Sequence, residues 1–283
     1  MCLFSSPVEY VANTRIFARA DGDHQLLAYQ MAVRNGYDAA MILPLPVPRG
    51  SGEDGVQFIG LQDSYAFFHD LAALFIDPTR SQPDPNSILL GLEKPPLLAV
   101  QNVGEYEASF VPTVADFERL DPRFRLPPSV WSQLSMYADW GFAVFKLSLN
   151  PAPTKLSALD LRIIAERKRD GKPPFPPRRR EIHPMAFRFP RRDPSSLFFP
   201  TMHVHDGAWH PEADFDHLIY AQRRDAVGSI EPSAAGPAWR VSRYGPEPDP
   251  KTAAAQLLRA HQPVDRLELR GRFPNADTFL PDP

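Results

Sequence analysis

The sequence predicts an α+β fold in which two mainly antiparallel β-sheets pack with a few short helices. About ten short segments have the alternating apolar and polar pattern of strands, and turn-forming residues separate them. Proline accounts for 33 of the 283 residues, and proline interrupts helices and central strands. Hydrophobic residues make up 43% of the chain, which is enough for a substantial core.

The N-terminal part is expected to form an antiparallel meander over residues 14–48. Its segments TRIFARA, HQLLAYQMAVRN and AAMILPLPVP have strand character, and the Asp-Gly and Asn-Gly pairs between them are hairpin turn sequences. A helix is expected over residues 63–75, because its apolar residues have helical spacing and Asp63 can serve as its N-cap.

The middle of the chain is expected to alternate strands and short helices. Strands are predicted over residues 97–103, 106–112 and 141–149, and helices over 114–120 and 127–140. Two prolines open the second of these helices, where the missing amide hydrogen does little harm.

Residues 155–180 form a basic, proline-rich insertion. This stretch has nine Lys or Arg residues, three Asp or Glu residues and four prolines. Phe175 is its single aromatic residue, so the stacking partners that nucleic-acid bases need are missing. The whole chain has a net charge of −3, and we therefore expect a solvated insertion and no nucleic-acid partner.

The C-terminal third is expected to return to β structure. Strands are predicted over 185–190, 195–210, 216–223 and 238–244. A Gly- and Pro-rich connector over residues 226–250 then leads to a final helix and strand. No internal repeat is present, and residues 1–283 are interpreted as one integrated domain.

Three histidines surround an Asp-Gly pair in the segment TMHVHDGAWH. A two-residue hairpin loop at Asp-Gly would place His203 opposite His210 and leave His205 on the same face. Three imidazoles so arranged can bind Zn, Cu or Fe, and His217 is available as a fourth ligand. The alternative is that these histidines form the solvated face of an exposed hairpin.

Cys2 suggests a different chemistry. Removal of Met1 would leave a thiol and a free amine on one residue, which is the arrangement of an N-terminal nucleophile that attacks amides. Arg15 and Arg19 are then candidates for binding a substrate carboxylate. The alternative is that Cys2 is an unreactive residue.

Four longer stretches resemble an uncharacterised bacterial family whose members begin with Met-Cys. They are residues 18–48, 103–120, 125–147 and 185–222, with the phrases ILPLPVP and FFPTMHVHDG among them. The chain is also similar to a broader family of secreted bacterial domains of unknown function. This resemblance implies one integrated domain that includes the histidine segment and the cysteine, and it assigns no activity.

The sequence thus favours a metal-binding protein, in which a metal-dependent hydrolytic or oxidative enzyme is preferred over a cysteine amidohydrolase. A non-catalytic binding module is a further alternative. We expect a small-molecule or peptide substrate and a cytoplasmic location, because the chain has one cysteine, no secretory signal and no apolar membrane span.

Overall fold

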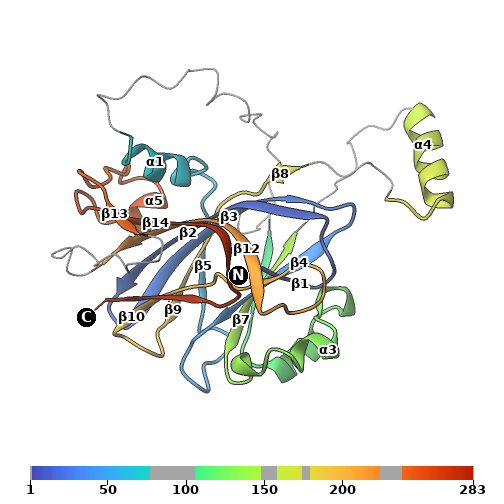
Figure 1. Cartoon of the computed structure of the whole chain (residues 1–283), viewed down its shortest axis with the longest axis horizontal. Coiled ribbons are helices and arrows are strands. Elements are labelled where there is room, and N and C mark those ends of the chain that lie inside the picture. The colour runs from blue at the N-terminus through green and yellow to red at the C-terminus, as the bar shows by residue number, and fades with distance from the viewer. Residues whose placement is uncertain (1, 77–105, 148–157, 174–178, 224–237, 283) are drawn as a thin grey trace.

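The computed structural model describes residues 2–76, 106–147, 158–173, 179–223 and 238–282. It confirms the α+β class, since most strand pairs are antiparallel and the helices are short (Figure 1). No helix in these ranges is both long enough and apolar enough to cross a membrane.

The first sheet has five strands within the described residues. In spatial order they are β11 (His203–Val204), β1 (Cys2–Phe4), β4 (Ala39–Leu45), β7 (Gly141–Leu147) and β6 (Glu107–Val111). All seven residues of β4 are buried, because the strand is central and covered on both faces. This explains why its sequence is apolar throughout and does not alternate.

The second sheet has eight strands in the described part of the chain. Its path is β13 (Trp239–Val241), β14 (Asp265–Pro274), β12 (Glu212–Gln222), β2 (Tyr10–Asp21), β3 (His24–Arg34), β9 (Met185–Pro190) and β5 (Gln57–Ile59), and β8 (Arg180–Glu181) also pairs with β3. Strands β10 (Ser196–Phe199) and β15 (Thr278–Pro281) form a separate antiparallel pair.

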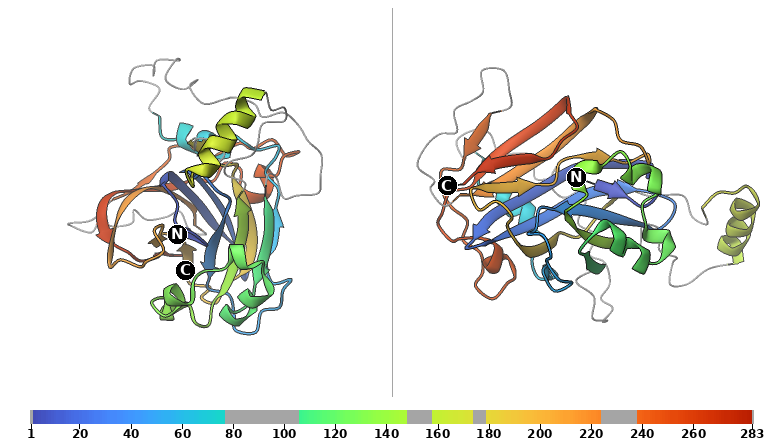
Figure 2. Two further views of the ribbon diagram at one scale, coloured as in Figure 1. Left: turned by 90° about the vertical axis from the view of Figure 1, so that its right-hand side faces the viewer. Right: turned by 90° about the horizontal axis from the view of Figure 1, so that it is seen from below.

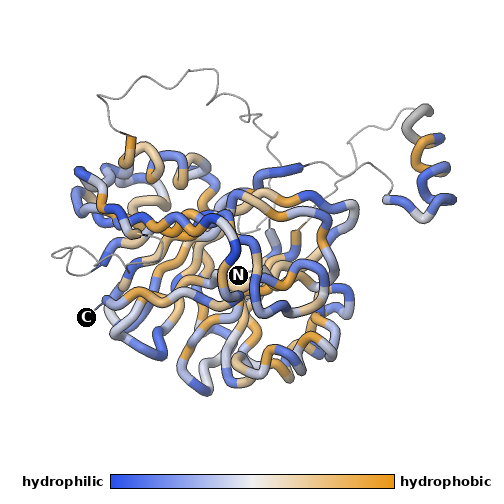
Figure 3. The backbone as a smooth tube through the Cα atoms, viewed as in Figure 1, coloured by the Kyte–Doolittle hydropathy of each residue, from blue (hydrophilic) through white to orange (hydrophobic). Residues whose placement is uncertain are grey.

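The two sheets pack face to face around the largest apolar cluster (Figure 2). Phe145 of the first sheet and Phe187 of the second lie in this cluster, with ring centroids 5.9 Å apart. In Figure 3 the apolar positions concentrate on the strands, as expected for a core built between sheets.

Short helices cover the outer face of each sheet. The first sheet is covered by η1 (Val114–Arg119), α3 (Pro128–Trp131) and η3 (Ser135–Tyr137). The second is covered by α1 (Phe67–Ala73) and α5 (Ala254–Leu257). The result is a four-layer order of helices, sheet, sheet and helices.

The expected meander is correct at its first turn and wrong at its second. Strands β2 and β3 form a hairpin at Gly22, whose φ of 61° suits the left-handed turn position. However, β4 pairs with β1 and β7 in the other sheet. The chain changes sheets here because the second edge of β3 is occupied by β9 and β8.

Several helices are shorter than the sequence predicts. The segment 127–140 forms the short α3 followed by η3, and α5 covers only part of the expected C-terminal helix. Asp63 is not a helix cap, since α1 begins after Ala66. The Asp63 carboxylate instead accepts a hydrogen bond from the backbone N–H of Ala253 at 3.1 Å, which ties the loop before α1 to α5.

Four predicted segments lie wholly or partly outside the described residues. They are the whole strand over 97–103, residues 148–149 of the strand over 141–149, residues 155–157 and 174–178 of the basic insertion, and residues 226–237 of the connector. Helix α4 (Ala158–Arg169) is the described core of the insertion, and it stands apart from both sheets in Figures 1 and 2.

Candidate functional site

The expected histidine hairpin is wrong. Strand β11 contains only His203 and Val204, and it pairs in parallel with β1, so that His203 is in register with Cys2. The Nε2 of His210 lies 2.8 Å from the Asp206 carboxylate, and the His210 side chain is 59% exposed. His210 therefore does not join the other histidines.

The backbone of this segment is bound by partners that are distant in sequence. His203 donates its N–H to the side-chain oxygen of Asn275 at 2.7 Å, and the Asn275 amide donates to the His203 carbonyl at 2.8 Å. The carbonyl of His205 accepts from the N–H of Val8 at 2.9 Å. Because these backbone N–H and C=O groups are already paired, they are not available for the cross-strand hydrogen bonds of a local hairpin.

Three histidines do meet, and they are His203, His205 and His217. Nδ1 of His203 lies 3.2 Å from Nε2 of His205. The His203 and His217 rings are 4.7 Å apart between centroids and nearly perpendicular, at 80°. We call these three residues the histidine cluster. It includes three of the four predicted ligands and leaves out His210.

The strands explain why these side chains converge. Val204 packs with Leu3 in the cluster on the outer face of the first sheet, so alternation turns its two neighbours His203 and His205 towards the interior. On β12, Ile219 belongs to the core between the sheets, and His217 is two residues earlier on the same face. The histidine cluster thus joins the two sheets.

The surroundings of the histidine cluster are largely aromatic. The Phe215 ring lies 4.6 Å from that of His203, and the Phe4 ring lies 5.8 Å from that of His205. His217 is fully buried, and His203 is 9% exposed. Asp216 is the nearest carboxylate along β12, and it accepts a hydrogen bond from the Asn13 N–H at 2.5 Å.

Burial keeps the histidine cluster neutral. Desolvation, followed by the proximity of His205, lowers the pKa of His203 to about 2. Desolvation also lowers the pKa of His205 to about 4 and holds that of His217 well below its ordinary value. At neutral pH each imidazole therefore has one nitrogen lone pair, and the lone pair of either His203 Nδ1 or His205 Nε2 accepts the hydrogen bond between these two rings.

Several buried polar atoms here lack hydrogen-bond partners among the described residues. They are Nε2 of His203, both ring nitrogens of His217, and Oγ1 of Thr14. Thr14 is on β2 next to Arg15, which is in register with Leu218, so it lies beside His217 in the sheet. A buried polar group without a partner costs about 1–3 kcal/mol, so these four atoms have bonding capacity that the described residues do not use.

No ready-made metal cage is present in the part of the chain that the structure describes. No group of three or more His, Cys, Asp or Glu side chains there could hold a metal ion as it stands. His203 and His205 are the pair with close nitrogens, and His217 contacts His203 through its ring. Ion binding would therefore require His217 to turn.

A turn between the last strands holds the histidine segment in place. Besides its two bonds to His203, Asn275 donates to the His210 carbonyl at 2.9 Å. Asp277 accepts from the N–H groups of Thr201 and Met202 at 2.9 and 3.0 Å. These contacts span more than 60 residues of sequence, and no local motif indicates them.

Arg15 and Arg19 lie on the opposite face of the second sheet from the histidine cluster. They alternate on β2 with Ile16 and Ala18, which are in the core between the sheets, and they share the outer face with Phe17. Arg15 contacts Gln30 and Glu181. The structure thus does not bring either arginine to Cys2 or to the histidines.

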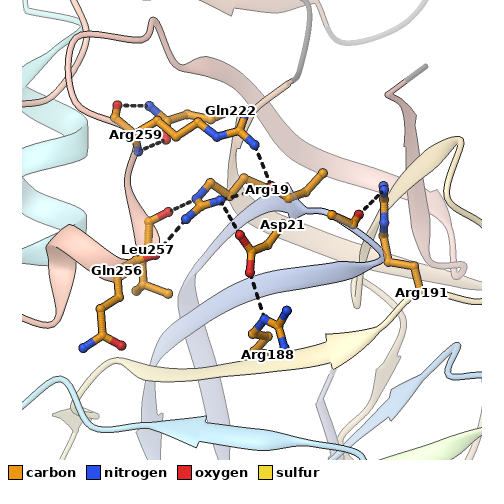
Figure 4. Close-up of polar contacts among 10 residues, drawn as sticks. Arg19, Asp21, Arg188, Arg191, Gln222, Gln256, Leu257 and Arg259 are labelled. Atoms are coloured by element: carbon orange, nitrogen blue, oxygen red, sulfur yellow. Dashed lines mark hydrogen bonds and ion pairs between the residues drawn. The ribbon is translucent and has the colours of Figure 1, made fainter.

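Arg19 has a structural role at the end of α5. Its guanidinium donates to the carbonyls of Leu257 at 2.5 Å and Gln256 at 2.8 Å, as Figure 4 shows. The last carbonyls of a helix have no partners within the helix, and Arg19 supplies donors for them. It is therefore not available to a substrate.

Replacement of Arg19 by Met is expected to destabilise the protein by about 2 kcal/mol, because two carbonyls at the end of α5 lose their donors. Arg15→Met is the matched control. Its partly exposed ion pair with Glu181 is expected to contribute less than about 1 kcal/mol. Urea unfolding of the two variants measures the difference, and equal effects would contradict this assignment.

Comparison of the chain with protein-family models, curated proteins and solved structures gives no match.

Proposed function

We propose that the protein binds one transition metal ion through His203, His205 and His217. The observation that supports this most is the convergence of three neutral, buried imidazoles, two of which have ring nitrogens without partners among the described residues. Metal ligation needs neutral imidazole, and burial keeps these three in that form.

Ligand spacing agrees with this proposal. Two nitrogens bound at about 2.0–2.1 Å to one tetrahedral ion are about 3.3 Å apart. Nδ1 of His203 and Nε2 of His205 are hydrogen-bonded at 3.2 Å, and an ion bound by these two nitrogens would replace the bond between them. The partnerless Nε2 of His203 is not one of these two atoms. A rotation of the His217 ring towards this pair would supply the third ligand.

The donor set limits the choice of ion. Nitrogen donors suit Zn, Cu and Fe, whereas Mg and Ca require oxygen ligands. Three histidine ligands would leave a fourth position for water, which is the arrangement of hydrolytic zinc enzymes and of sites that activate dioxygen. We further propose a cytoplasmic protein that acts on a small molecule or a peptide.

A cysteine-dependent amide hydrolase or transferase is the second candidate. The register of Cys2 with His203 favours it, because a nucleophilic thiol needs a base close by. Two observations weaken it. The buried His203 has a strongly lowered pKa and is a poor proton acceptor, and Arg15 and Arg19 are engaged on the other face of the sheet.

Metal analysis of tag-free protein, purified without chelators, tests the first proposal. We expect about one equivalent of a single transition metal, or uptake of one equivalent of zinc by metal-free protein. The double variant His203→Ala/His217→Ala is expected to lose at least about 100-fold in zinc affinity, because even changes beyond the ligands cost 10–100-fold.

His210→Ala is the matched control, because this histidine is exposed and pairs with Asp206. Its zinc affinity is expected to equal that of the wild type. Failure of the wild type to take up zinc, copper or iron would contradict the proposal, as would an equal loss of affinity in the control.

A further inference from the structure

We propose that Thr14 is a positioning residue of the metal site, whose hydroxyl accepts the ring N–H of His217 when His217 binds the ion. This inference rests on the function proposed above, and it names the group that holds the third ligand in place. It leaves the fourth position of the ion open.

A β-bulge in β2 turns the Thr14 side chain towards the interior. Asn13 and Thr14 together lie opposite Met31 alone, which gives β2 one extra residue at this point. Val11, before the bulge, packs against the core between the sheets, and Ile16, after the bulge, belongs to that core. The extra residue thus moves the inward face from odd to even positions, so that Thr14 is buried and Asn13 is exposed.

The bulge is attached to β12 next to His217. The Asn13 N–H donates to the Asp216 carboxylate at 2.5 Å, and Asn13 has a φ of 54°, a left-handed conformation that is uncommon for residues other than glycine. Strands β2 and β12 are parallel, and Thr14 and His217 immediately precede a pair of residues in register. The two residues are therefore neighbours on the inner face, one strand spacing of about 4.8 Å apart.

Thr14 and His217 both have unused bonding capacity. Oγ1 of Thr14 and the two ring nitrogens of His217 have no hydrogen-bond partner in the described part of the chain, and neither residue is more than 1% exposed. Buried polar groups are normally paired, so two unpaired groups side by side are unusual. The rotation of the His217 ring that ion binding requires can bring its N–H to the Thr14 hydroxyl.

The chemistry of imidazole makes such an acceptor necessary. A neutral imidazole has one lone pair and one N–H, so when one nitrogen of His217 binds the ion, the other has a hydrogen to donate. Metal-bound histidines almost always donate this hydrogen to a neighbouring oxygen, which fixes the orientation of the ring. No proton is released in this step, because the lone pair binds the ion and the N–H bond stays intact.

Asp216 is the other oxygen donor close to His217. Its carboxylate lies 3.9 Å from Nδ1 of His217, which is beyond hydrogen-bond distance, and it already accepts the Asn13 N–H. The Asp216 side chain is also 44% exposed, whereas that of His217 is fully buried. These observations favour Thr14 as the acceptor inside the protein.

Zinc titration of metal-free, tag-free variants tests the role of the hydroxyl. Valine has the shape of threonine without the hydroxyl, and Thr14→Val is expected to lose about 10–100-fold in zinc affinity. Thr14→Ser keeps the hydroxyl and is expected to retain most of the wild-type affinity. Asp216→Asn keeps an oxygen for the Asn13 N–H and is likewise expected to retain it.

Urea unfolding of the metal-free proteins distinguishes positioning of a ligand from a purely structural role. The unfolding midpoint of Thr14→Val is expected to equal or exceed that of the wild type, because valine removes a buried hydroxyl that has no partner among the described residues. A residue that only stabilised the fold would instead lower the midpoint when replaced.

Three results would overturn the role of Thr14 and leave the metal proposal standing. They are wild-type zinc affinity in Thr14→Val, an equal loss of affinity in Thr14→Val and Thr14→Ser, and a lower unfolding midpoint of metal-free Thr14→Val. Failure of the wild type to bind zinc at all would refute both proposals.

Discussion

Acidification of the metal-free protein from about pH 6.5 to about pH 5 is expected to lower its free energy of unfolding by roughly 3–5 kcal/mol. Burial lowers the pKa values of His203 to about 2 and His205 to about 4, and holds that of His217 well below 6.5. In the unfolded chain these histidines take up protons near pH 6.5. Below that pH the unfolded state therefore binds more protons than the folded state.

The sign and size of this change in the free energy of unfolding follow from the linkage between proton binding and folding. The contribution of the neutral histidines is complete above about pH 6.5 and is lost as the pH falls towards their folded pKa values, at about 1.4 kcal/mol per histidine and pH unit. Asp277 opposes this effect, since burial raises the pKa of its carboxyl group. One opposing carboxyl against three imidazoles leaves a net loss of stability.

Urea unfolding at several pH values, in the presence of a chelator, measures this dependence. His217→Leu is expected to remove about a third of the histidine contribution, because one of three titrating groups is lost. His210→Gln is the control and is expected to leave the pH dependence unchanged, since His210 is exposed. A stability that varies by less than about 1 kcal/mol between pH 7 and pH 5 would contradict the neutral, buried state of the histidine cluster.

Local sequence patterns predict much of the secondary structure. The β2–β3 hairpin follows from its Asp-Gly turn, and the apolar segment that became β4 is recognisably a strand. Which strand lies beside which is not predictable in the same way. The pairing of β1 with β11 joins residues about 200 positions apart, and nothing in either two- or three-residue strand specifies the other.

The candidate site was predicted in part and for the wrong reason. His203, His205 and His217 do converge, but through alternation on strands of two different sheets and without any hairpin at Asp-Gly. His210 was included because the expected register placed it opposite His203. The expected pairing of His203 with His210 does not form, because β1 and Asn275 bind the backbone of His203.

The arginines show a second limit of sequence reasoning. Arg15 and Arg19 are close to Cys2 in the chain and have the right chemistry for a carboxylate. A strand turns successive side chains to opposite faces, and both arginines face the outer layer that includes α5. Only the packing of the sheets decides which face is the interior.

Asn275→Ala is expected to destabilise the protein by about 3–4 kcal/mol, the largest effect that we predict for a single substitution. The Asn275 side chain is buried and makes three hydrogen bonds, one from the His203 N–H and two to the carbonyls of His203 and His210. Alanine would leave these backbone groups without partners. Each buried N–H or C=O group without a hydrogen bond lowers the free energy of unfolding by about 1–3 kcal/mol. Urea unfolding at pH 7 measures the change.

Asn275→Asp distinguishes the hydrogen bond that Asn275 accepts from the two that it donates. Aspartate keeps an oxygen that accepts the His203 N–H, but it lacks the amide hydrogens that bind the carbonyls of His203 and His210. The Asn275→Asp variant is therefore expected to lose at least as much stability as Asn275→Ala. Because Asn275 holds the backbone at His203, zinc affinity is expected to fall by about 10–100-fold in both variants. Unchanged zinc affinity in a folded Asn275→Ala variant would show that β1 alone suffices to hold His203 beside His205 and His217, and that the turn between β14 and β15 contributes to stability without orienting the ligands.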